Sequence, residues 1–200
     1  CHVLNQLQII FTKLAQAERS RLKKEKAAAS SLTNAASVLE GSYMELRPYQ
    51  REALDKCKQQ NSLLVLPTGA GKTRVAGEVL VQRLIGKAKG AAIGIFIVEK
   101  VNLVNQQQAR LQRIFDRAWA SEHGRHLTVM GYSGGQGLKG ADFKHESETY
   151  DVLVLTAGLY ENFLASSDAS FDKVAVLVVD ECHHARMPPH SNSIFTRILT

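Results

Sequence analysis

The chain has 200 residues, of which 44% are apolar and 22% are charged, a composition that is ordinary for one globular domain. Its formal net charge is +6, with the basic surplus in the first ninety residues, which is compatible with a polyanionic partner but is weak support on its own. No apolar run approaches a bilayer span, and three cysteines without a C-x-x-C pair indicate neither a disulfide framework nor a zinc site. We therefore expect an intracellular protein of the cytoplasm or nucleus, with no membrane partner.

Residues 1–40 differ in character from the rest of the chain, because they are rich in Gln, Ala and Lys. Apolar side chains recur there at three- and four-residue steps, at Leu4, Leu7, Phe11 and Leu14, which predicts an amphipathic helix. Gly41 and Ser42 then mark a boundary. We expect an N-terminal helical segment at 1–40, followed by a core domain at 41–200.

Beyond this boundary, short apolar runs alternate with stretches of helical period. The pattern predicts helices at 47–60, 71–87, 101–119 and 157–165, and strands at 62–66, 91–98, 126–133, 150–156 and 173–180. Residues 131–140 are a Gly-rich loop, and 141–149 are too polar to assign. Apolar strands separated by helices predict an α/β fold with a mainly parallel sheet covered by helices on both faces.

The turn between the first of these strands and the next helix reads PTGAGKT, from Pro67 to Thr73. Its glycines let backbone amides converge, and the start of the helix adds unpaired N–H groups, so an anion fits there. Lys72 can reach the β- and γ-phosphates of a nucleotide, and the Thr73 hydroxyl can ligate Mg²⁺. We therefore predict a P-loop made of Thr68, Gly69, Ala70, Gly71, Lys72 and Thr73. The strict G-x-x-x-x-G-K-[ST] pattern has Gly where this chain has Leu66.

Two carboxylates follow the last predicted strand, in the stretch VLVVDECHHA. Because ligands of open α/β sheets lie at the carboxyl ends of strands, Asp180 and Glu181 are expected at the same sheet edge as the P-loop. Asp180 is suited to holding Mg²⁺ through its water shell, and Glu181 to deprotonating the water that attacks the γ-phosphate. We predict that Lys72, Asp180 and Glu181 carry the catalysis.

Six segments follow one another along the chain in this order: LRPYQREAL, PTGAGKT, VEKVNLVNQQ, YSGG, VLTA and VDECHH. Over residues 43–200 this order resembles the first RecA-like lobe of superfamily 2 helicases. The D-E-C-H box with R-P-Y-Q upstream is most similar to the helicase domains of Dicer and of Dicer-related RNA sensors. The resemblance implies an ATP- and Mg²⁺-dependent lobe that works on RNA, double-stranded in this branch, together with a second RecA-like lobe.

The resemblance also implies roles for individual residues. Gln50 matches the glutamine that reads the adenine edge, supported by Arg47 and Tyr49. Contacts to a nucleic-acid backbone would come from Lys100, Gln106, Ser133, Gly134 and Thr156. Glu99 and Lys100 depart from the small polar or Pro-Thr pair that the family usually has at the first of these loops. Gln107 also matches the family's helix glutamines, although an exposed helix face would carry glutamines too.

The family's later parts, which are the Ser-Ala-Thr segment and the second lobe with its arginine fingers, would follow Thr200. Because the chain also begins with Cys1, we expect a piece of a longer protein whose core domain is incomplete at its C-terminal end. Such a fragment should bind nucleotide weakly and turn it over little. Two other readings stay open: a DNA-directed helicase of the same superfamily, and a nucleic-acid sensor that ATP gates without unwinding.

Overall fold

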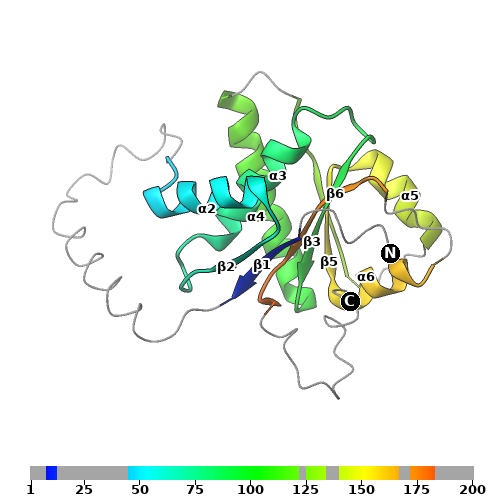
Figure 1. The fold of residues 1–200 in the computed structure, drawn as a ribbon. Helices are drawn as coiled ribbons and strands as arrows, with labels where there is room; N and C mark the ends of the chain where they lie inside the picture. The colour runs from blue at the N-terminus through cyan, green and yellow to red at the C-terminus, as the bar shows by residue number, and fades with distance from the viewer. Residues whose placement is uncertain (1–7, 13–44, 122–124, 134–139, 167–171, 183–200) are drawn as a thin grey trace, which may run out of the picture.

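A parallel sheet forms the centre of the molecule. The structure is a computed structural model that describes residues 8–12, 45–121, 125–133, 140–166 and 172–182 (Figure 1). Within these ranges, six strands pair in the order β2-β1-β6-β3-β5-β4, and every neighbouring pair is parallel. The strands are β1 (Gln8–Thr12), β2 (Ser62–Val65), β3 (Ile93–Val98), β4 (Val129–Tyr132), β5 (Val152–Thr156) and β6 (Val174–Val179).

Helices cover both faces of this sheet (Figure 1). They are α2 (Pro48–Gln59), α3 (Lys72–Leu84), α4 (Val101–Ser121), α5 (Gly140–Thr149) and α6 (Ala157–Leu164). The first three pack on one face, and α5 and α6 pack on the other. The predicted α/β fold, a mainly parallel sheet with helices on both sides, is confirmed. Among the described helices, none combines the length and the apolar character that crossing a bilayer requires.

Alternation along the central strands divides the core into two layers. In β3, Phe96 and Val98 face the layer under α2, α3 and α4, whereas Ile95 and Ile97 face the layer under α5 and α6. All six residues of β3 are buried. A strand covered on both faces needs apolar residues at consecutive positions, which is why the sequence shows an uninterrupted apolar run there.

The expectation of a helix across residues 1–40 is wrong for residues 8–12. These residues form β1, which lies between β2 and β6 and pairs Ile9 with Ser62 on one side and with Val178 on the other. Two isoleucines, a phenylalanine and a threonine in succession favour an extended chain, and pairing on both edges of the strand outweighs the helical spacing of the apolar residues. The rest of the predicted segment lies outside the described residues.

Residues 141–149, which were too polar to assign, form α5 together with Gly140, which was expected in the loop. Phe143 is fully buried in the core layer under α5 and α6, and its ring lies 5.2 Å from that of Phe163 on α6. Asp142 in the first turn complements the helix dipole. One buried aromatic ring thus docks a helix whose sequence is otherwise polar.

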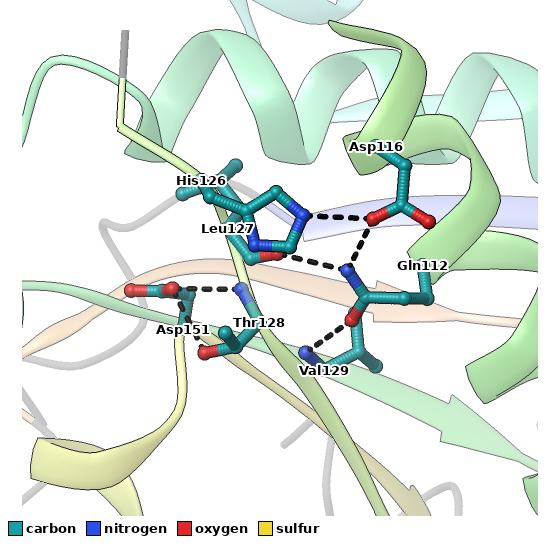
Figure 2. Close-up of polar contacts among 7 residues, drawn as sticks. All are labelled: Gln112, Asp116, His126, Leu127, Thr128, Val129 and Asp151. Atoms are coloured by element: carbon teal, nitrogen blue, oxygen red, sulfur yellow. Dashed lines mark hydrogen bonds and ion pairs between the residues drawn. The ribbon is translucent and has the colours of Figure 1, made fainter. Parts of the chain in front are cut away.

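A polar network ties α4 to the start of β4 and β5 (Figure 2). The Gln112 side chain accepts the backbone N–H of Val129 at 3.0 Å and donates to the carbonyl of Leu127 at 3.1 Å. Asp151, which is fully buried, accepts both the N–H and the hydroxyl of Thr128. These bonds satisfy backbone groups at the amino-terminal edge of the sheet, opposite the strand ends that were predicted to carry function.

A first prediction concerns close packing around Gly94 of β3. A Cβ at this position would lie 2.5 Å from Cδ2 of Leu80 and 3.3 Å from Cδ1 of Leu84. Gly94→Ala should therefore lower the free energy of unfolding by roughly 1–3 kcal/mol, as overpacked cores do. Urea-induced unfolding checks this. Gly86→Ala is the control, because a Cβ there meets nothing within 4 Å, and it should be neutral or stabilise by up to about 1 kcal/mol. Equal effects of the two changes would contradict the packing argument.

Candidate nucleotide-binding site

The predicted P-loop connects β2 to α3 at the carboxyl edge of the sheet. Gly69 and Gly71 adopt φ angles of 81° and 85°, which favour glycine, and Gly71 is the N-cap of α3. The N–H of Ala70 donates to the carbonyl of Pro67 at 3.1 Å, closing the turn. The helix therefore begins at Lys72 with its unpaired N–H groups next to the loop, which is the arrangement that binds phosphate.

The carbonyl of Ala70 holds the P-loop against the start of α2. It accepts hydrogen bonds from the Tyr49 hydroxyl and from Nε2 of Gln50, both at 2.9 Å. Oε1 of Gln50 accepts the backbone N–H of Arg47 at 3.0 Å. Gln50 is buried, and its amide connects the P-loop at Ala70 to the N-cap residue of α2, Arg47. The predicted adenine contact of Gln50 and Arg47 stays a prediction.

The two carboxylates follow β6 at the same edge. The N–H of Asp180 donates to the carbonyl of Ile97 at 2.9 Å, which extends the pairing of β6 with β3 by one residue. Oδ1 of Asp180 accepts the N–H of Glu181 at 3.1 Å, and Glu181 has a φ of 51°. In a non-glycine residue such a conformation is uncommon and is found preferentially at functional sites.

Side chains that follow β2 and β6 approach each other at the carboxyl edge of the sheet. Nζ of Lys72 lies 3.8 Å from Oε1 of Glu181, and both side chains are largely buried. Burial, followed by the negative charge of Glu181, raises the pKa of Asp180, whereas the charge of Lys72 lowers it. Additional positive charge here, which a divalent cation would provide, would therefore stabilise the ionised form of the carboxylates.

These side chains line one cleft of about 390 Å³. Its lining consists of Thr68, Gly69, Gly71, Lys72, Thr73, Gln107, Arg110, Asp180 and Glu181. The structure thus brings most of the predicted phosphate, metal and catalytic residues together. Gln50, Arg47 and the buried Ala70 are not among the lining residues.

Sequence reasoning missed Gln107 and Arg110 as parts of this cleft. Both lie on α4, three residues apart, and therefore share a helix face. The triplet Gln106-Gln107-Gln108 does not indicate which glutamine points inward. That depends on the rotation of α4 about its own axis as it packs on the sheet. Gln107 is buried and donates to Oδ2 of Asp180, whereas Gln106 is exposed.

The predicted nucleic-acid residues lie along the same edge, farther from the P-loop. Lys100 and Gln106 are exposed after β3 and on α4, Ser133 follows β4, and Thr156 is the N-cap of α6. Gly134 lies outside the described residues. Since the sheet order continues β6-β3-β5-β4, these positions form a row beside the cleft. Their contacts with nucleic acid stay a prediction.

Comparison with known proteins agrees with this geometry. A family model described as type III restriction enzyme, res subunit, matches residues 43–199. The chain belongs to this family. A mouse protein named ATP-dependent RNA helicase DHX58 is 35% identical over 161 residues, which cover 78% of this chain and 22% of that protein. The expected resemblance to superfamily 2 helicases of the Dicer-related kind is confirmed.

Two Dicer proteins match this member of the family over a similar region. Endoribonuclease Dicer homolog 2 of Arabidopsis thaliana is 36% identical over 143 residues, which cover 70% of this chain and 10% of that protein. Protein Dicer of Schizosaccharomyces pombe is 32% identical over 161 residues, covering 77% and 11%. The chain therefore spans only a small part of these relatives. The yeast DEAD-box splicing factor Prp28 shares the fold, with a TM-score of 0.54 and 23% identity over 69% of this chain and 32% of that one.

The second prediction concerns the fit of the P-loop against Gln50. Both P-loop glycines have positive φ, but only at Gly71 would a Cβ collide with Nε2 of Gln50, whereas at Gly69 it meets nothing within 4 Å. Gly69→Ala should lower the free energy of unfolding by about 1–2 kcal/mol through backbone strain alone. Gly71→Ala should lower it by roughly 2–4 kcal/mol, because overpacking adds to the strain. Chemical denaturation measures both, and a smaller loss at Gly71 than at Gly69 would refute the bracing role of Gln50.

The third prediction concerns Cys182, which follows Asp180 and Glu181. Burial, together with the charges of Glu181 and Asp180, raises the pKa of this thiol to about 12. At about pH 8 its thiolate fraction should be on the order of 10³ lower than that of a free cysteine, so iodoacetamide should alkylate it correspondingly slowly. Peptide mass spectrometry of labelled protein measures this, with the urea-unfolded chain as the reference. Rapid labelling of Cys182 in the folded protein would contradict the burial.

Proposed function

We propose that this chain is the ATP-binding first lobe of an ATP-dependent RNA helicase or translocase that acts on double-stranded RNA. It would hydrolyse ATP to ADP and phosphate when joined to a second RecA-like lobe. The observation that carries the proposal is the single cleft in which Lys72 and Thr73 face Asp180 and Glu181. The printed names of the relatives, an ATP-dependent RNA helicase and two Dicer proteins, support RNA as the partner.

The proposed chemistry follows from the groups around the cleft. Loop amides and the first N–H groups of α3 would receive the phosphates, and Lys72 would neutralise the β- and γ-phosphates. Glu181 would hold the attacking water and accept its proton, a role that its carboxylate can fill at the cleft surface. Lys72, whose Nζ lies 3.8 Å from Oε1 of Glu181, would keep this carboxylate beside the phosphates.

The residues present fit Mg²⁺. The Asp180 carboxylate and the Thr73 hydroxyl supply the oxygen ligands that this ion prefers. Burial raises the pKa of Asp180, and a bound cation would offset that penalty on the ionised form. When bound, Mg²⁺ would neutralise charge on the β- and γ-phosphates. The fit supports ATP with Mg²⁺ as the ligand pair.

A second lobe would complete the reaction. An arginine finger is worth about 10³–10⁵ in rate, so this lobe alone should bind nucleotide and hydrolyse it slowly. Closure of the two lobes over ATP and RNA would convert hydrolysis into movement along the duplex.

The fourth prediction tests this function in the full-length protein. Phosphate release should rise when double-stranded RNA is added and rise less with duplex DNA. Lys72→Ala should lose nucleotide binding, because the main phosphate cation is gone. Glu181→Gln should still bind ATP but lose turnover by about 10²–10⁴-fold, the range expected for a general base.

A second lysine–glutamate pair provides matched controls. Lys173 and Glu148 are also 3.8 Å apart, but they lie at the amino-terminal edge of the sheet. Lys173→Ala and Glu148→Gln should therefore leave turnover within about twofold, because exposed pairs contribute little. Equal losses in both sets would refute the assigned roles. Stimulation by DNA alone would favour a DNA-directed helicase, and RNA-dependent turnover without strand separation would favour a sensor.

A further inference from the structure

Two consecutive glutamines of α4 have opposite surroundings. Gln106 is exposed, whereas Gln107 is only 4% exposed and lines the cleft beside Lys72 and Thr73. Nε2 of Gln107 donates to Oδ2 of Asp180 at 3.2 Å. Since Oδ1 of Asp180 accepts the N–H of Glu181, the carboxylate is held from both sides and its orientation is fixed.

The other end of the Gln107 amide has no such partner. Its Oε1 is buried and accepts no hydrogen bond from the described residues. Burying an acceptor without a donor disfavours folding, and an apolar side chain of the same length would avoid this penalty. Stability alone therefore does not account for a glutamine here, whereas a ligand that donates a hydrogen bond inside the cleft does.

The chemistry of the cleft indicates what this donor is. A water molecule bound to a cation has its lone pair directed at the metal, so it presents only hydrogens to its surroundings, and both Asp180 and Oε1 of Gln107 are acceptors. Mg²⁺ usually keeps several of its waters, and protein groups that bind those waters fix the ion in place. The Gln107 amide donates to Asp180 through Nε2, and its Oε1 is left to accept a hydrogen bond from such a water.

We propose that Gln107 is a positioning residue for the cation: it orients Asp180 through Nε2 and accepts a hydrogen bond from cation-bound water through Oε1. The inference rests on the proposed ATP site, because it assigns Gln107 to the Mg²⁺ of the bound nucleotide. It separates Gln107 from its neighbour Gln106, which retains the predicted role toward nucleic acid.

The test measures the binding of a non-hydrolysable ATP analogue to the full-length protein by calorimetry, with Mg²⁺ and with EDTA. Gln107→Met keeps the length of the side chain and removes the amide. It should lose about tenfold or more of the affinity gained from Mg²⁺, the usual effect of an outer-shell group, while affinity in EDTA stays within about twofold. Gln107→Asn draws the amide back by one methylene and should show the same loss.

Gln112→Met is the matched control on the same helix. The Gln112 amide does not line the cleft; it bonds Asp116, Leu127 and Val129, which lie toward the amino-terminal edge of the sheet (Figure 2). Its replacement should lower the melting temperature of the nucleotide-free protein more than Gln107→Met does, yet leave the Mg²⁺ gain intact. A melting temperature lowered more by Gln107→Met than by Gln112→Met would indicate a structural role and overturn the proposal.

The remaining outcomes separate the inference from the proposed function. If the wild-type protein binds the analogue more tightly with Mg²⁺ and Gln107→Met does the same, the positioning role is wrong while the ATP site stands. If Gln107→Met weakens binding equally with and without Mg²⁺, the amide contacts the nucleotide itself, and the proposal is also wrong. If the wild-type protein binds no nucleotide under either condition, the proposed function fails and this inference fails with it.

Discussion

The common direction of the strands is the constraint on which the rest of this structure depends. Because β2 and β6 run parallel, the chain leaves both at the same edge of the sheet, and the P-loop and the two carboxylates come within reach of each other. The strand between them is β1, so two strand spacings, or about 10 Å, separate the backbones of the two halves. Long side chains such as Lys72 and Glu181 are what close this gap, as their 3.8 Å separation shows.

A second constraint acts on the P-loop itself. Those loop amides that are presented to an anion cannot also form hydrogen bonds within the loop, so its shape depends partly on other contacts. Here the carbonyl of Ala70 provides the attachment, with the side chains of Tyr49 and Gln50 as donors. Gly71 lies directly against Gln50, which links the requirement for glycine to this brace as well as to the positive φ.

The cleft contains charged side chains of both signs, so it can bind a ligand that carries both negative and positive charge. Asp180 is disfavoured as an anion by burial and by Glu181, and Lys72 offsets this only in part. A nucleotide with its cation would add negative phosphates opposite Lys72 and a positive ion opposite Asp180. Gln107 fits the same view, because a neutral amide can orient a carboxylate without neutralising it. The site therefore combines fixed backbone geometry with charged side chains of both signs, Lys72 and Arg110 beside Asp180 and Glu181.

Local chemistry in the sequence determined the fold class and the core of the candidate site. Apolar runs of strand length identified β2, β3, β5 and β6, and residue types at fixed spacing identified Lys72, Thr73, Asp180 and Glu181. Only the tertiary structure decided three other features. Residues 8–12 form a strand because two neighbours pair with it, α5 forms around one buried phenylalanine, and Gln107 instead of Gln106 enters the cleft. Each depends on contacts between residues far apart in the chain, and hydrophobic period alone carries no information about those partners.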